Sequence, residues 1–176
     1  VKILNPTSEL VNCGEIIPQI RVKNNGENPI TEIDISYIIG NNTPFGTQTY
    51  NLSWTGNLPS LGLETIDLIP LSLNLGNYQM QVNVSIANDV YQSNNNKSVT
   101  FQTNNSASPG NLMSFEANSD RLLEVPEYGI KAWQMGQPTG TELNTSWSGT
   151  KVYATNLDGN YPDNIKTYLY SPCFDL

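Results

Sequence analysis

The sequence predicts an all-β protein whose first part is a seven-stranded antiparallel sandwich. Between Ile16 and Phe101 apolar residues alternate with polar ones, and clusters rich in Asn and Gly separate the alternating runs. Alternation with a period of two is typical of strands that bury one face. Charged residues make up 14% of the chain. No stretch shows a sustained apolar period of about 3.6 residues, so we expect almost no helix.

Seven runs mark the strands in chain order. Proline cannot donate to a ladder, so Pro18 predicts that the second strand lies at an edge or is bulged there. Residues 55–57 (Thr-Gly-Asn) predict a turn after the fourth strand. Residues 24–26 and 76–77 supply the Asn and Gly that tight connections with positive φ require. The predicted strands cover residues 2–4, 16–22, 33–39, 50–54, 66–70, 78–86 and 99–101.

Short motifs follow one another through the first hundred residues. The pattern Pro-x-Ile-x-Val-x-Asn-x-Gly occupies 18–26, and a Trp-Thr-Gly-Asn-Leu segment begins at Trp54. A strand entry at 75–78 and an Asn-rich turn at 93–96 come next. In this order the motifs of residues 1–103 resemble the CARDB-type immunoglobulin-like domains of bacteria. The resemblance implies an immunoglobulin-like sandwich.

A second module is expected after a linker at 104–110, which holds no large apolar side chain. Five motifs then occur in residues 111–176, ending with Tyr-x-Thr-Asn-Leu-x-Gly-x-Tyr at 153–161 and Leu-x-Ser-Pro at 169–172. The earlier three are Phe115-Glu116, Trp-x-x-Gly-x-Pro at 133–138, and Trp147-Ser-Gly.

This order resembles the N-terminal part of the MAM-like jelly-roll domains of secreted bacterial peptidases, such as immune-inhibitor-A-like enzymes, and of adhesins. Tyr153 stands where those domains usually have tryptophan, and Trp147 where they usually have a small residue. We expect the jelly roll to be partial. An incomplete module leaves sheet edges open, so we also expect it either to dock its apolar side onto the sandwich or to swap strands between molecules, which would give self-association through the second module.

Composition excludes several function classes. The formal net charge is −8, with eight Lys and Arg residues, which argues against nucleic-acid partners because they are held through phosphate contacts. The chain has no run of about 18 apolar residues, so no membrane insertion is expected. It also has no histidine, which removes Ser-His-Asp and Cys-His nucleophilic machinery and histidine zinc sites.

Calcium is the one cofactor that the sequence predicts. Asp158, Asn160 and Asp163 surround a tight turn at Gly159, and Ca²⁺ binds six to eight hard oxygen ligands. The jelly-roll resemblance adds the Glu116 carboxylate, because Phe-Glu openings in related domains often contribute to structural calcium. The alternative is a solvated turn, in which Asp, Asn and Gly are favoured for their conformations alone.

Aromatic and acidic residues offer two further site types. Trp147 is the candidate ligand-binding residue, as part of a platform for sugar rings, whereas aromatic residues in strands more often serve packing. A pair of acids can serve a glycosidase, but nothing in the sequence singles out a pair, so we expect no catalysis. The acids considered are Glu116, Asp120, Glu124, Glu127 and Glu142.

The two cysteines, Cys13 and Cys173, match no zinc spacing. Three states remain open: a bridge between them, pairing of Cys173 with a cysteine outside this chain, and two free thiols.

Together with both resemblances, the sequence predicts that the chain is the non-catalytic accessory region of a secreted or cell-surface bacterial hydrolase. The resemblance to MAM-like jelly-roll domains implies that this hydrolase is a peptidase. The chain would act as a spacer and contact the catalytic domain, a polymeric substrate or the cell surface. The alternative is an adhesin or carbohydrate-binding module.

Overall fold

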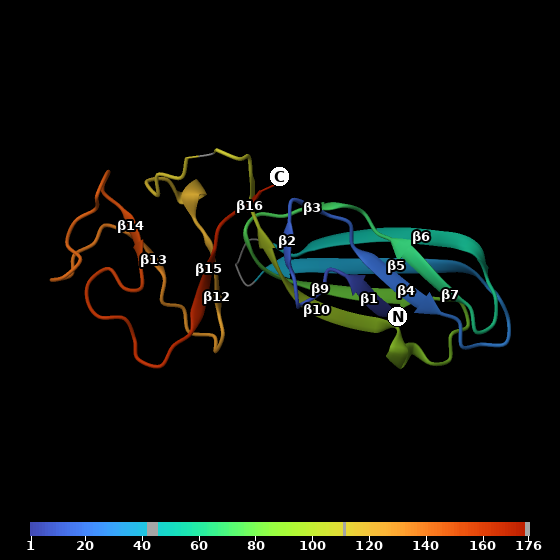
Figure 1. The fold of residues 1–176 in the computed structure, drawn as a ribbon. Helices are drawn as coiled ribbons and strands as arrows, with labels where there is room; N and C mark the ends of the chain where they lie inside the picture. Colours follow the sequence, from blue (N-terminus) through green and yellow to red (C-terminus); the bar gives the residue numbers. More distant parts are fainter. Residues whose placement is uncertain (42–45, 111, 175–176) are drawn as a thin grey trace. The chain divides into compact units, whose positions relative to one another are not determined.

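The computed structural model describes residues 1–41, 46–110 and 112–174 (Figure 1). The chain divides into two compact units, Val1–Asn105 and Ser106–Leu176. The division falls within the segment expected to be a linker. That segment is not entirely irregular, because Asn104 ends one strand and Ser106 begins another.

The first unit is a β-sandwich. Its larger sheet has the strand order β2-β10-β9-β5-β6, and its smaller sheet has the order β1-β4-β7. A short pair, β3-β8, accompanies them, and a 3₁₀ turn (η1, Gln92–Asn94) lies before β10. The strands are β1 (Lys2–Asn5), β2 (Val11–Cys13), β3 (Glu15–Ile16), β4 (Gln19–Lys23), β5 (Ile30–Asn41), β6 (Gln48–Leu58), β7 (Leu63–Asp67), β8 (Leu71–Ser72), β9 (Gly76–Ser85) and β10 (Asn96–Asn104).

The apolar half of the alternation forms one continuous core between the two sheets. Tyr37 is fully buried in it, with its ring stacked on that of Tyr50 at 4.8 Å between centroids and its hydroxyl donating to the carbonyl of Ile69. The buried cluster consists of Ile16, Ile20, Val22, Ile33, Ile35, Tyr37, Ile39, Leu58, Ile66, Leu68, Leu71, Met80, Val82, Val84 and Phe101.

The turn expected at residues 55–57 is wrong, because β6 continues through it to Leu58. The pairing of β5 with β6 shifts register there: Ile30 pairs with Leu58, and Glu32 pairs with Thr55. A bulge therefore absorbs the Gly-Asn pair without ending the strand. Gly56 is needed at that point because a Cβ on it would lie 2.4 Å from the Trp54 ring.

Proline and glycine positions also differ from expectation. Pro18 lies between β3 and β4, so it interrupts the predicted strand, and β4 is the central strand of its sheet rather than an edge. Residues 24–26 and 76–77 do not adopt positive φ; among the described residues of the first unit, positive φ occurs instead at Gly14, Gly46, Leu61 and Asn88.

The larger sheet contains one strand that the sequence did not predict. The strand β2 pairs in parallel with β10, whereas the remaining pairs of the two main sheets are antiparallel. It covers Val11–Cys13 and is too short to show an alternating pattern. The two main sheets therefore contain eight strands within the described residues, against seven expected.

The second unit is also built from strands, arranged as three separate two-stranded sheets among its described residues: β11-β16, β12-β15 and β13-β14. Only the first of these pairs is parallel. Among its described residues the buried apolar side chains are Leu123, Ala132, Pro138 and Pro172. Its elements are β11 (Ser106–Ala107), η2 (Asn118–Asp120), β12 (Leu123–Pro126), β13 (Gln134–Gly136), β14 (Val152–Ala154), β15 (Thr167–Tyr170) and β16 (Cys173–Phe174).

Two of the quoted motifs contact each other in this unit. A Cβ on Gly136 would lie 2.7 Å from Leu157 Cδ1, so a larger residue there would require the Leu157 side chain to move. The side chain of Gln134 accepts a hydrogen bond from the backbone amide of Leu157 at 3.0 Å. The glycine of the Trp-x-x-Gly motif therefore lets Leu157 pack closely against the backbone.

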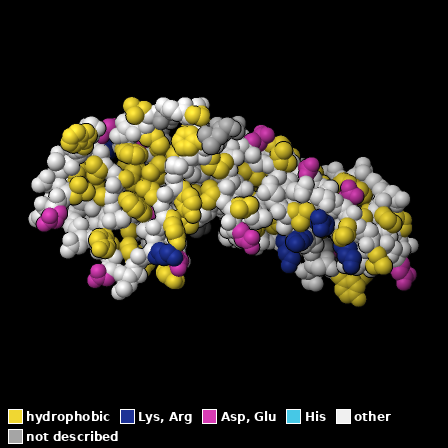
Figure 2. Space-filling model, viewed as in Figure 1, with side chains coloured by type: hydrophobic (Ala, Val, Ile, Leu, Met, Phe, Trp, Pro, Cys, Tyr) yellow, Lys and Arg dark blue, Asp and Glu magenta, His cyan; other side chains and the backbone are white. Residues whose placement is uncertain are grey.

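The smaller sheet of the sandwich carries exposed basic side chains. On the smaller sheet Lys2, Arg21 and Lys23 are exposed, and Lys2 and Arg21 occupy paired positions on neighbouring strands. Figure 2 shows Lys and Arg side chains gathered on one part of the first unit. Across the described part of the chain, no helix has the length and apolar character that crossing a membrane would require.

Candidate functional site

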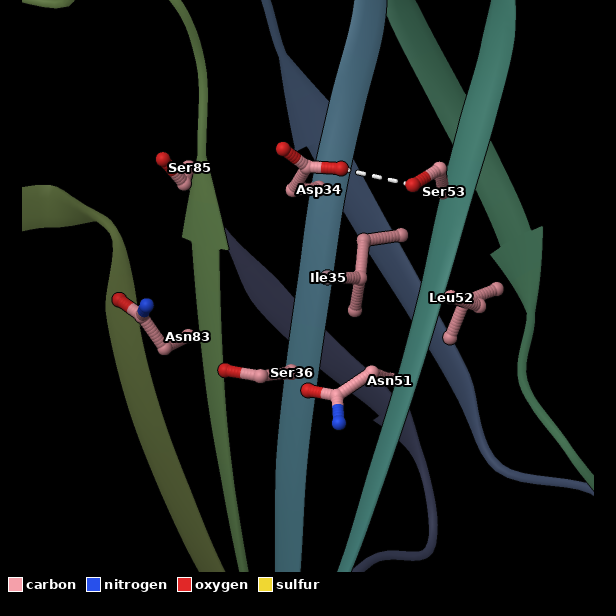
Figure 3. Close-up of a pocket in the computed structure, with 8 residues that line it drawn as sticks. All are labelled: Asp34, Ile35, Ser36, Asn51, Leu52, Ser53, Asn83 and Ser85. Carbon is pink, nitrogen blue, oxygen red and sulfur yellow. Dashed lines mark hydrogen bonds between the residues drawn. The ribbon is translucent and has the colours of Figure 1, made fainter.

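A shallow hollow of about 320 Å³ opens on the outer face of the larger sheet of the first unit (Figure 3). Three neighbouring strands, β9, β5 and β6, build it. This volume is at the lower end of the range of small-molecule pockets, about 300–1,000 Å³. The lining residues are Asp34, Ile35, Ser36, Asn51, Leu52, Ser53, Asn83 and Ser85.

Strand register explains the hollow. Ser36 is paired with Asn51 on one side and with Asn83 on the other, and Figure 3 shows its short side chain between the two amides. In the next row Asp34 is paired with Ser53 and Ser85. The Ser53 hydroxyl donates to the Asp34 carboxylate at 2.7 Å. Short hydroxyl side chains therefore form the floor, and longer amides form the rim.

The side chains that line the hollow are suited to hydrogen bonding with an uncharged ligand. Its side chains offer amides and hydroxyls around a single carboxylate, Asp34. Such groups can donate to and accept from the hydroxyls of a neutral ligand. The lining carries no cation, so it offers no charge partner to phosphate, sulfate or carboxylate groups.

A second pocket of the first unit, of about 530 Å³, lies among the loops at residues 24–29 and 86–91. The Asp89 carboxylate accepts a hydrogen bond from the backbone amide of Tyr91 and so fixes the turn. Val90 and Tyr91 are both strongly exposed there. This end of the sandwich thus combines a pocket of mixed polar and apolar lining with two large exposed side chains.

The predicted calcium ligand Glu116 is engaged in local hydrogen bonds. Its carboxylate accepts from the backbone amides of Thr150 and Lys151, both at 2.8 Å, and from the Thr150 hydroxyl at 2.7 Å. The Thr150 hydroxyl is the main reason that the pKa of Glu116 lies below its usual value, followed by the amide of Lys151. Gly149 makes room for the carboxylate, since a Cβ on it would lie 2.4 Å from Glu116 Oε1.

The acidic turn is held by a residue that the sequence analysis did not single out. Asn156 donates from its side chain to the carbonyl of Asn160 at 2.8 Å and accepts from the amide of Asp158. Asp158, Asn160 and Asp163 are exposed. The side chain of Asn156 therefore closes the turn around Gly159.

The structure does not bring the four predicted calcium ligands together. Glu116 contacts the 150–151 segment, and no hydrogen bond of the described residues joins it to the turn that carries Asp158. Within residues 1–41, 46–110 and 112–174, no group of three or more His, Cys, Asp or Glu side chains is placed to hold a metal ion. Calcium therefore stays a prediction.

The three tryptophans have different environments. Trp147 is 102% exposed, so its whole ring faces solvent. Trp54 packs against the core of the first unit, and Trp133 is half-buried with its ring N–H unpaired. Trp147 thus has the exposure that a contact residue needs.

The acids considered for catalysis have local contacts. Glu124 is 9% exposed, and its Oε1 accepts from the backbone amides of Ala132 and Trp133 and from the Thr167 hydroxyl. These bonds join β12 to β15 and to the segment before β13, which is a structural task. Three further acids have no comparable buried set of hydrogen bonds among the described residues. Asp120 accepts hydrogen bonds from Ser114 and Phe115, and Glu127 forms an ion pair with Lys166. Glu142 is exposed.

Both cysteines, Cys13 and Cys173, are disulfide-bonded in the structure. The alternative of two free thiols is therefore wrong.

The hollow of Figure 3 was missed by sequence reasoning. The sequence feature that indicates the hollow is the set of polar residues in the alternating strands, because Asp34 is paired with Ser53 and Ser36 with Asn51. Pairing partners and register are needed to see that these positions meet. No protein-family model matches the chain, and no curated protein matches it.

Proposed function

We propose that the chain is a non-catalytic accessory region of a secreted bacterial hydrolase, a peptidase in the first instance. The sandwich serves as a rigid spacer. The second unit contacts a polymeric substrate, the cell surface or the catalytic domain of the same polypeptide. The partial jelly-roll interpretation of the second unit belongs to this proposal.

The observation that carries the proposal is the exposure of Trp147. An indole ring is a large apolar surface with one polar handle, and such side chains are enriched where proteins contact partners. Trp147 is 102% exposed, more than any other large apolar side chain among the described residues of this unit, whereas the rings of Phe115 and Tyr153 pack against each other at 5.3 Å. Full exposure keeps this ring available for a partner.

Other features support the proposal. The single continuous core of the first unit gives the stiffness that a spacer needs. A disulfide is typical of proteins that work outside the reducing cytosol. Glu124, the buried acid of the second unit, spends its hydrogen bonds on backbone amides and a threonine hydroxyl.

The test is binding to insoluble polymers with matched variants. Purified chain is incubated with collagen fibres, and the bound fraction is measured as a function of concentration. We expect Trp147→Ala to weaken binding by about tenfold or more, as loss of an aromatic hot spot does. Tyr161→Ala is the control, because Tyr161 is 66% exposed in the same unit. Equal binding by wild type and Trp147→Ala would contradict the role of Trp147.

A second candidate function, carbohydrate binding or adhesion, is favoured by the hollow on the first unit. Its amides, hydroxyls and single carboxylate suit the hydroxyl groups of a neutral sugar. Retention on neutral polysaccharide gels tests it, with Ser36→Leu filling the floor of the hollow. Retention that Ser36→Leu abolishes and Trp147→Ala leaves unchanged would favour this candidate over the first.

A further inference from the structure

The strand β6 forms one edge of the larger sheet. Among the described residues it pairs with β5 alone, and that pairing is continuous from Gln48 to Thr55. On its other side, no strand of the described residues pairs with its alternate backbone N–H and C=O groups. The edge is therefore a template on which another strand can be added.

This edge lacks the usual protection against pairing. Natural edge strands are kept short, carry charges or proline, or are bulged. The sequence of β6, QTYNLSWTGNL, is eleven residues long and contains neither a charged residue nor a proline. Its bulge lies at Gly56 and Asn57, at the far end of the strand, and leaves the segment before it regular.

The two faces of β6 differ, and both leave surface to be covered. Tyr50, Leu52 and Trp54 point toward the core but are only half-buried, so part of each apolar side chain remains exposed along the edge. On the outer face the side chains are exposed, neutral and polar: Thr49, Asn51, Ser53 and Thr55.

We propose that two copies of this chain pair through β6, antiparallel and about a two-fold axis, to join their larger sheets into one. With Ser53 opposite its own copy, Leu52 lies opposite Trp54 of the second molecule, and Asn51 lies opposite Thr55. Apolar side chains then meet apolar ones on the core face, and neutral polar ones meet on the outer face. An isologous contact of this kind closes on itself and does not form fibres.

A second copy is the partner that β6 itself specifies. A two-fold axis places every residue of the strand opposite a residue of the same strand, so any charge on it would face or neighbour its own copy. The strand carries no charge, and like charges in opposite positions are what destabilise such pairs. Under this two-fold axis Tyr50, Leu52 and Trp54 pair only with residues of the same alternate set in the second copy. The apolar residues of both copies therefore lie on the same face of the joined sheet.

The test measures the mass of chain 1–176 by sedimentation equilibrium over a wide concentration range. The edge variant is Asn51→Lys/Ser53→Lys, and the control is Gln79→Lys/Gln81→Lys on β9, an interior strand of the same sheet with exposed side chains. Both change the net charge from −8 to −6 by adding two lysines. General repulsion is thus equal in the two variants. Circular dichroism verifies that each is folded.

We expect a monomer–dimer equilibrium whose dissociation constant rises about tenfold or more in the edge variant and changes less than about threefold in the control. In a second approach, Ser53→Cys should form an interchain disulfide under mild oxidation, since opposite Cβ atoms lie about 5 Å apart. Gln81→Cys should not. A chain that stays monomeric, with no preferential crosslinking of Ser53→Cys, would overturn the proposal. So would a dimer that the edge lysines leave intact, because that dimer forms elsewhere, for example through the second unit.

Discussion

Replacing Asn24 by alanine should destabilise the first unit substantially. Asn24 is 2% exposed, although it is polar and follows the strand β4. Its side-chain amide donates to the carbonyls of Asn28 and Leu58, at 2.8 and 3.0 Å, and its oxygen accepts from the amide of Gly26 at 2.9 Å. One side chain therefore joins the loop before β5 to the end of β6.

The magnitude follows from these three hydrogen bonds. Each contributes about 1 kcal/mol net, and a buried carbonyl left without a partner costs more. The alanine variant should thus lose about 2–4 kcal/mol of the free energy of unfolding. For a unit of this size that corresponds to a fall in Tm of about 10 °C or more.

The assay is urea unfolding followed by circular dichroism, with thermal scans alongside. Asn25→Ala is the matched control, because its side chain is exposed at the next position; such substitutions usually change stability by less than about 0.5 kcal/mol. If Asn24→Ala and Asn25→Ala unfold within 0.5 kcal/mol of each other (about the limit of the control), the structural role assigned to Asn24 is refuted.

Four further predictions concern charge, redox state and metal. Burial, together with the neighbouring Tyr50, raises the pKa of Tyr37 from 10.0 to about 12, so stability should fall as pH rises above about 10, seen as alkaline unfolding that Tyr37→Phe delays. Because the pKa of Glu116 is lowered in the folded state, the stability that its carboxylate contributes should be present above pH 4.5 and lost as pH falls below that value. Glu116→Gln should therefore lower Tm at pH 7 and reduce the loss of Tm on acidification. Peptide mapping without reductant should find Cys13 linked to Cys173, and two unlinked peptides would contradict this. Adding Ca²⁺ should raise Tm by stabilising the predicted calcium site, and a chelator should reverse the shift. An unchanged Tm would contradict the prediction of calcium binding.

Much of the sandwich could be predicted from the sequence because its strands bury one face. Alternation alone predicts that Ile33, Ile35 and Ile39 share one strand face, and all three are in the core. The same signal fails where local conformation depends on tertiary contacts. The Thr-Gly-Asn segment at 55–57 has turn composition, yet the Trp54 ring over Gly56 and the register shift keep it inside β6.

Less of the candidate sites could be predicted. The sequence singled out Trp147, but only coordinates show that its ring is fully exposed. The motif around Glu116 predicts a metal ligand, whereas the hydrogen bonds that Glu116 accepts from Thr150 and Lys151 depend on a contact distant in sequence. The hollow around Ser36 required strand register, which alternation within single strands does not specify.

The proposal that this chain contacts a polymer without cleaving it is tested most directly by measuring binding and product release in one experiment. Purified chain is incubated with labelled insoluble protein and polysaccharide, and both bound protein and soluble label are followed over time. We expect saturable binding, weakened by Trp147→Ala, with no soluble label above the level of a buffer control. Release of label that a single acid-to-amide substitution such as Glu124→Gln abolishes, in a variant that remains folded, would contradict the account.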